Sequence, residues 1–196
     1  MKTFKNLALI ALVAVFTFSF TKVNAQQKEI KIANSKVIWK GYKVTGSHEG
    51  TINLKSGFLT FNDNKLTGGE FVMDMTTIKN TDIKSDKYRG DLEKHLRSDD
   101  FFGVQKFPES KFVIKESKYL TSGSILVKGE ITIKGITKPL EFEVDSHKHG
   151  ESVYVSGLMV IDRTQFDIRY GSGSFFDNLG DRTINNDFEI KFDLMF

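Results

Sequence analysis

Apolar and polar residues alternate with a period of two through most of this chain. The clearest example lies at 188–196, and shorter runs lie at 71–75, 131–133 and 140–144. In the first of these, the apolar side chains that share one face are Phe188, Ile190, Phe192, Leu194 and Phe196. This alternation is typical of antiparallel strands that bury one face and expose the other.

Short segments rich in Gly, Asn and Asp separate the alternating runs. Asp63-Asn64 and Lys134-Gly135 are examples, and residues of this kind favour tight turns. The sequence therefore predicts strands near 36–45, 49–55, 57–62, 68–76, 111–120, 124–134, 138–146, 151–162 and 184–196. Eight or nine short strands at this spacing favour an all-β sandwich or a closed barrel.

One stretch has helical spacing instead. Between about 86 and 98, the apolar side is formed by Tyr88, Leu92, His95 and Leu96. Acidic residues come early in this stretch and basic residues late, as the helix dipole favours. We predict one short helix between the fourth and fifth strands, where it would cover one end of a barrel.

The N-terminus has the pattern of a secretory signal. Lys2 and Lys5 precede an apolar run over 7–20, and Val23 and Ala25 match the small residues that signal peptidase recognises. We therefore predict a cleaved signal peptide over 1–25 and one domain over 26–196. The apolar run is shorter than the roughly 20 residues of a spanning helix, so we expect no transmembrane anchor after cleavage, and a periplasmic or secreted protein.

The net basic charge belongs to this N-terminal segment. Lys2, Lys5 and Lys22 lie in it. The rest of the chain has 25 Lys and Arg residues and 25 Asp and Glu residues, so its formal net charge is zero. A neutral domain gives no support for a nucleic-acid partner. The chain has no cysteine, which excludes disulfides, cysteine nucleophiles and iron–sulfur clusters.

The histidines do not form a recognisable catalytic or metal motif. None stands beside a Gly-x-Ser-x-Gly motif, and His147-Lys-His149 supplies two imidazoles where a zinc site needs three or four ligands. For His95 we favour a core histidine bonded to a backbone carbonyl. The alternative is an enzyme acting on an apolar substrate through His95 with Asp99 or Arg163.

Phenylalanine is unusually frequent, with 18 residues, and many fall on inward-facing positions of the predicted strands. They form either an ordinary filled core or the lining of a lumen for an apolar ligand. An eight-stranded barrel has an interior just wide enough for either arrangement. Alternation by itself does not distinguish the two.

Four segments in order resemble the YceI-like family of exported proteins. They are Asp74–Ile78, His95–Phe102 followed by Phe107-Pro108, Gly129–Pro139 and Asp162–Gly171. The agreement extends from about residue 37 to the C-terminus. The resemblance implies a lipocalin-like, extended antiparallel barrel with a long apolar tunnel. It also implies a non-enzymatic protein that binds a polyisoprenoid, such as an isoprenoid quinone or a prenyl pyrophosphate.

We accordingly expect an exported carrier without a covalent cofactor, whose ligand is an isoprenoid lipid. The residues expected to line the tunnel are Trp39, Phe71, Met73, Phe101, Phe102, Phe112, Ile131, Ile133, Phe142, Phe166, Phe188 and Phe192. His95 and Arg163 are the candidate polar contacts. For Arg163, a salt bridge to Asp162, Asp167 or Asp100 that fixes a loop is favoured over a contact with a pyrophosphate or quinone oxygen. The alternative function is a structural or stress-related module with a filled core, and the sequence leaves open whether the chain forms a homodimer.

Overall fold

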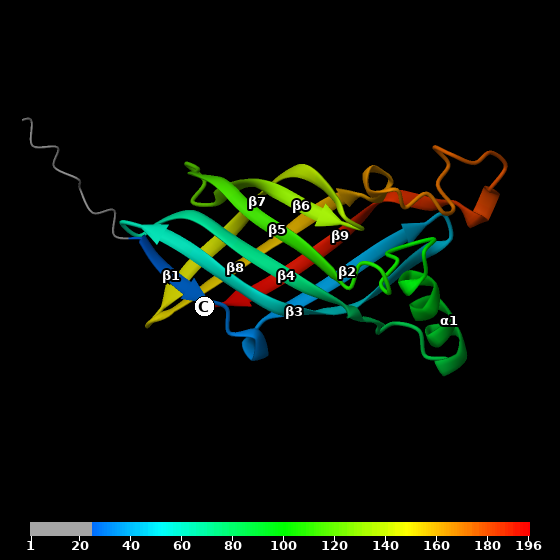
Figure 1. The fold of residues 1–196 in the computed structure, drawn as a ribbon, viewed down its shortest axis with the longest axis horizontal. Coiled ribbons are helices and arrows are strands. Elements are labelled where there is room, and N and C mark those ends of the chain that lie inside the picture. Colours follow the sequence, from blue (N-terminus) through cyan, green and yellow to red (C-terminus); the bar gives the residue numbers. More distant parts are fainter. Residues whose placement is uncertain (1–24) are drawn as a thin grey trace, which may run out of the picture.

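Nine strands form one antiparallel sheet that closes into a barrel. The computed structural model describes residues 25–196, so the predicted signal peptide falls outside the described residues, apart from Ala25. The strands are β1 (Ala25–Glu29), β2 (Lys36–Lys43), β3 (Gly46–Asn62), β4 (Lys65–Asn80), β5 (Glu109–Tyr119), β6 (Ile125–Ile133), β7 (Ile136–His149), β8 (Ser152–Asp162) and β9 (Ile184–Met195). Their order is β1-β3-β2-β9-β8-β7-β6-β5-β4, and a further pairing of β3 with β4 closes the ring. The closed barrel of β2 to β9 is elongated, with β1 alongside β3 (Figure 1).

This architecture confirms the predicted all-β barrel with a short helix between β4 and β5. Two details differ from the prediction. The strands expected at 49–55 and 57–62 are one strand, β3, because Gly57 pairs with Phe71 inside the ladder instead of making a turn. β1 was not predicted, because its sequence has no apolar alternation. Main-chain pairing with Phe58–Asn62 of β3 holds it in place.

The helix α1 (Asp86–Arg97) lies at one end of the barrel (Figure 1). Asp86 begins it and Lys94 and Arg97 lie in its last turn, where their charges complement the helix dipole. Leu96 is buried in the core, whereas Tyr88, expected on the apolar side, is 66% exposed. No helix within residues 25–196 is long and apolar enough to cross a membrane.

Aromatic rings from neighbouring strands interlock inside the barrel. Phe112, Phe142 and Phe192 form a row of rings whose centroids lie 5.2 Å and 5.9 Å apart. Two glycines make room for this row. A Cβ atom at Gly129 would lie 2.6 Å from the Phe112 ring, and one at Gly157 would lie 2.7 Å from the Phe192 ring. Since tilted and edge-to-face pairs pack favourably, the interior is organised around phenylalanine.

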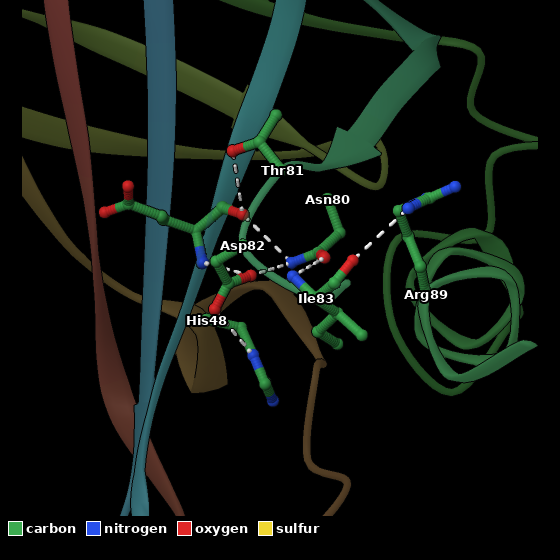
Figure 2. A network of polar contacts seen from close by, with 7 residues as sticks. His48, Asn80, Thr81, Asp82, Ile83 and Arg89 are labelled. Atoms are coloured by element: carbon green, nitrogen blue, oxygen red, sulfur yellow. Dashed lines mark hydrogen bonds and ion pairs between the residues drawn. The ribbon is translucent and has the colours of Figure 1, made fainter. Parts of the chain in front are cut away.

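A buried asparagine joins the end of β4 to β3 and to the segment that leads into α1. Asn80 donates from Nδ2 to the Glu49 carbonyl oxygen at 2.9 Å and to Asp82 Oδ1, and its Oδ1 accepts from the Ile83 N–H at 3.0 Å. Arg89 of α1 donates to the Ile83 carbonyl oxygen at 3.2 Å, as Figure 2 shows. Hydrogen bonds therefore tie α1 to the end of the barrel.

Asp82 completes this network, with its Oδ2 3.0 Å from His48 Nδ1. Burial raises the pKa of Asp82, but hydrogen bonds from His48, Asn80 and the Glu49 N–H together hold that pKa below its ordinary value. The carboxylate is therefore ionised at neutral pH, where it accepts all three bonds.

The Asn80→Ala change should lower the free energy of unfolding by about 2–3 kcal/mol, because it leaves the Ile83 N–H without its acceptor in a part-buried position. Urea unfolding followed by the fluorescence of Trp39, the single tryptophan, measures this loss. The control is Thr81→Ala, which removes only a long bond of 3.4 Å to the same Glu49 oxygen and should cost well under about 1 kcal/mol. Equal losses in the two variants would show that Asn80 does not hold this end of the barrel together.

Candidate functional site

An apolar cavity of about 170 Å³ lies inside the barrel, and side chains from all eight strands β2 to β9 line it. Along β8 it extends from Val155 to Ile161 and on to Arg163. An apolar cavity of about 150 Å³ can stay dry and hold a molecule the size of benzene. The existing space therefore accommodates a short apolar segment, and a longer chain requires lining side chains to shift.

Eleven of the twelve residues expected in the tunnel line this cavity. They are Trp39, Phe71, Met73, Phe101, Phe102, Phe112, Ile131, Ile133, Phe142, Phe188 and Phe192. Phe166 lies instead in the 3₁₀ helix η2 (Arg163–Phe166), where it is 2% exposed and packs in the core away from the lining. Of the two candidate polar contacts, Arg163 lines the cavity and His95 does not.

Besides Met73, Ile131 and Ile133, the lining contains aliphatic and methionine residues that were not predicted. They include Leu54, Leu59, Met75, Ile78, Met159 and Ile161. Met75, Met159 and Ile161 follow the period-two alternation of their strands, so the pattern could have identified them, whereas register shifts between β3 and β4 interrupt it near Leu54 and Ile78. Methionine side chains are flexible and fill irregular space, which suits a cavity whose occupant differs in shape from its lining.

The cavity reaches the surface where β2 and β9 separate near α1. Gly41 pairs with Phe188 and Lys43 pairs with Ile184, so one residue of β2 faces three of β9 in this bulge. Two of those three, Asn185 and Asp187, are exposed and yet line the cavity. We call this opening, formed by Gly41, Tyr42, Asn185 and Asp187, the mouth.

Tyr42 is held at the mouth by its phenol, which donates to Glu189 Oε2 at 2.8 Å. This hydrogen bond raises the pKa of Tyr42, and burial and the charge of Glu189 raise it further. Tyr42 therefore remains a neutral donor at physiological pH and is already committed to Glu189.

Arg163 is 4% exposed and binds three backbone carbonyl oxygens. Its Nε donates to Asn185 at 2.9 Å, its Nη1 to Ile168 at 2.7 Å and its Nη2 to Ile184 at 3.0 Å. Burial lowers the pKa of Arg163, while the charge of Asp162 opposes that shift. Arg163 thus fixes a loop, as expected, but through carbonyl oxygens and not through the predicted carboxylates. Its bonds also define the β9 side of the mouth.

His95 packs among rings. Its imidazole lies edge-on to Phe101 at 4.8 Å and to Tyr170 at 4.4 Å, and its Nε2 lies 3.5 Å from Asp100 Oδ2. The prediction of a core histidine bonded to a backbone carbonyl is therefore wrong, since a third of the His95 side chain is exposed and its charged neighbour is a carboxylate. Asp99 pairs with Lys106 at 2.6 Å in solvent, so the groups of the enzyme hypothesis do not meet in the cavity.

The structure offers no candidate metal centre within residues 25–196, where no three His, Asp or Glu side chains come together. The imidazole of His147, one of the pair considered as ligands, stacks on the Tyr154 ring with centroids 5.0 Å apart.

Toward the β1 end of the barrel, Phe196 packs against Phe71, which lines the cavity. Phe196 is 4% exposed, its ring lies edge-on to Phe71 at 6.1 Å, and its backbone exchanges two hydrogen bonds with Val153. Phe196 and Val153 line a second, more polar pocket of about 720 Å³ at the β1 end. Phe196 therefore lies between Phe71 of the cavity lining and this larger pocket.

Residues 25–196 form a closed eight-stranded antiparallel barrel with an apolar cavity, an extra strand and one α-helix at one end. This fold belongs to the class of lipocalin-like barrels. Within that class, the YceI-like domain matches residues 22–196. The chain therefore belongs to the YceI-like family.

Curated relatives are UPF0312 proteins. The chain is 30% identical over 102 residues to one from Shewanella denitrificans, covering 52% of this chain and 50% of the relative. It is 28% identical over 153 residues to one from Vibrio parahaemolyticus, covering 74% and 76%. The first of these matches thus spans about half the length of the relative.

Solved structures share the fold at low identity. BcnA of Burkholderia cenocepacia has a TM-score of 0.69 at 20% identity, covering 85% of this chain and 99% of BcnA. A polyisoprenoid binding domain from Saccharophagus degradans has a TM-score of 0.61 at 10% identity, covering 89% and 98%. The Campylobacter jejuni YceI protein has a TM-score of 0.53 at 14% identity, covering 98% of both chains.

Replacing Arg163 with Met or Lys should lower the free energy of unfolding by about 3 kcal/mol or more, because three carbonyl oxygens lose a charged donor. Lys is no substitute, since an ammonium lacks the planar fork that reaches all three oxygens. Urea unfolding measures the change.

The control is Arg169→Met, at an exposed ion pair with Asp167, which should change the free energy of unfolding by about 0.5 kcal/mol or less. If Arg163→Met lowered the free energy of unfolding by less than about 1 kcal/mol, the three hydrogen bonds of Arg163 would not be what holds the β9 side of the mouth in place.

Proposed function

We propose that this protein is an exported carrier that holds the chain of an isoprenoid lipid in the barrel cavity, with the lipid's polar end at the mouth. The observation that carries the proposal is a continuous apolar cavity inside the barrel, with Arg163 and the mouth residues in its lining. Membership of the YceI-like family and the fold shared with a polyisoprenoid binding domain support it. Residues 1–25 supply the export signal in this proposal, and the domain acts by binding, without catalysis.

Burial of the lipid chain would supply most of the affinity. Each buried CH₂ group contributes about 0.8 kcal/mol, less the cost of ordering the ligand and the lining. Because the cavity holds only a short segment as it stands, Phe and Met side chains such as Phe142, Met73 and Met159 must rearrange around a long chain. The ligand is thus accommodated by a lining that adapts.

The hydrogen bonds of Arg163 favour a quinone over a prenyl pyrophosphate. Its guanidinium is already engaged by three carbonyl oxygens. The other charges near the mouth are of both signs, because Asp187 and Glu189 are negative and Lys40 and Lys43 are positive. A neutral quinone needs no cationic partner, whereas a pyrophosphate does, and we therefore place an isoprenoid quinone first.

The second candidate is a structural or stress-related module with a filled core. The small volume of the existing cavity, about 170 Å³, favours it. Native mass spectrometry and organic extraction of the purified protein distinguish the two. A carrier should retain an isoprenoid or take up a long-chain ubiquinone, and a filled module should do neither.

A carboxylate inside the barrel should abolish quinone uptake. Phe142→Asp and Phe192→Asp each place a charge against an apolar chain, which is strongly unfavourable. Quenching of Trp39 fluorescence by added ubiquinone measures uptake. Val160→Asp is the control because Val160 is 52% exposed on the outside of β8, and it should bind normally.

If Phe142→Asp fails to fold, Phe142→Trp tests the same point by filling the lumen, and it should weaken uptake of long chains. A folded Phe142→Asp that still takes up ubiquinone would show that the quinone binds elsewhere.

Phe196 should limit the length of chain that fits. In Phe196→Ala the apolar cavity would join the pocket beyond it, so the preferred prenyl chain should lengthen. Competition between short-chain and long-chain ubiquinones for the wild type and the variant measures this preference. An unchanged preference would mean that the chain does not extend to the β1 end.

A further inference from the structure

Large apolar side chains are exposed together at the end of the barrel that carries the mouth. Val44 is 64% exposed, Tyr170 48%, Phe175 45% and Phe176 51%. We call these four residues the aromatic rim. The loop that bears three of them, between η2 and β9, projects beyond the strands at the α1 end in Figure 1. Patches of this kind on a soluble domain mark interaction sites.

The loop holds its aromatic residues in a defined turn. Ser172 is fully buried and donates from Oγ to Asn186 Oδ1 at 2.7 Å. The Ser172 carbonyl oxygen accepts from the N–H groups of both Phe175 and Phe176 at 3.1 Å. Arg169 lies over the Phe175 ring, 4.9 Å from its centroid. The exposure of the two rings is therefore imposed by hydrogen bonds at the base of the turn.

The aromatic rim borders the mouth. The Ile184 N–H donates to the Gly171 carbonyl oxygen at 2.8 Å, and the Val44 N–H donates to the Thr183 carbonyl oxygen at 3.2 Å. Asn186, which anchors Ser172, is the middle residue of the β9 bulge that forms the mouth. Tyr170 in turn contacts His95 of α1. Rim, mouth and helix thus form one continuous surface.

We propose that the aromatic rim inserts into the surface of a lipid bilayer and sets the mouth against the membrane. Phe side chains would enter the acyl region, and Tyr170 would remain at the polar boundary, where tyrosine is favoured. The purpose of this docking rests on the proposed function, since an isoprenoid could then pass between bilayer and cavity without crossing water. The docking itself needs no ligand.

Charge around the rim indicates which bilayer it fits. Charged residues of both signs lie near the rim and the mouth. The positive residues are Lys40, Lys43, Arg169 and Arg182, and the negative residues are Asp167, Asp177, Asp181, Asp187 and Glu189. This mixture gives no net attraction to anionic lipids. Insertion is therefore apolar in origin, and it should occur on zwitterionic membranes and depend little on salt.

Flotation with phosphatidylcholine vesicles that contain no isoprenoid tests the docking. The wild type should float with the vesicles. The double variant Phe175→Ser, Phe176→Ser should show a partition coefficient lower by at least roughly tenfold, because two rings no longer insert. Raising salt from about 0.1 to about 1 M should leave wild-type flotation unchanged.

The matched control is Leu158→Ser, Val160→Ser, which removes two apolar side chains that are 46% and 52% exposed on β8 and do not belong to the rim. It should float as the wild type does. All variants carry the same N-terminus, so that segment contributes equally. Absence of wild-type flotation, or equal losses in both double variants, would overturn the proposal. The proposal would also be overturned if the wild type formed a dimer and did not bind vesicles, and if the rim variant were a monomer. The rim would then join two copies of this chain.

Uptake of ubiquinone added from dilute ethanol separates this proposal from the proposed function. The rim variant should take up as much ubiquinone from ethanol as the wild type but acquire it more slowly from vesicles. Flotation without any uptake would leave the docking standing and refute the carrier. Uptake without flotation would refute the docking and leave the carrier standing.

Discussion

The pairing of β3 with β4 is the constraint on which the rest of the structure depends. It runs from Gly50 opposite Asn80 to Asn62 opposite Lys65, and it turns an open sheet into a ring with one interior. Closure removes the sheet edges that would otherwise pair with other chains. Register shifts along this pair, such as the one between Leu54 and Ser56, let two long strands bend around the core. Without closure, the Phe and Met side chains on the inner faces would enclose nothing.

Within that ring, the buried charge of Arg163 affects both the stability of the barrel and the shape of the mouth. A buried guanidinium in an apolar barrel is costly unless it is hydrogen-bonded, and each of the three Arg163 nitrogens donates to a carbonyl oxygen. Two of those oxygens belong to Ile184 and Asn185, at the place where β9 departs from β2. The same bonds that make the charge tolerable therefore hold open the wall of the barrel. Stability and access to the cavity depend on one side chain.

The interior and the mouth have different physical characters. Around Phe112, Phe142 and Phe192 the packing is aromatic, with glycine on neighbouring strands where a ring needs room. At the mouth, polar side chains and main-chain hydrogen bonds set the geometry, and the exposed aromatic residues beside it are held by Ser172. An apolar lumen whose opening is set by hydrogen bonds suits the carrier role that we propose.

Particular elements show which features of the structure could be predicted from the sequence. The alternation at 188–196 and 71–75 determined the all-β class and most of the aromatic lining, because side chains in a strand must point to opposite faces whatever their neighbours are. The choice of a lipocalin-like barrel over a sandwich came from the resemblance to the YceI-like family. Phe166 was placed in the lining by sequence although it lies in η2, where alternation no longer applies. Only the tertiary structure decided four other features. They are β1, the bulge opposite Tyr42, the three carbonyl partners of Arg163 and the position of Phe196. They depend on main-chain pairing and on contacts between residues far apart in the chain, and neither leaves a periodic signal in the sequence.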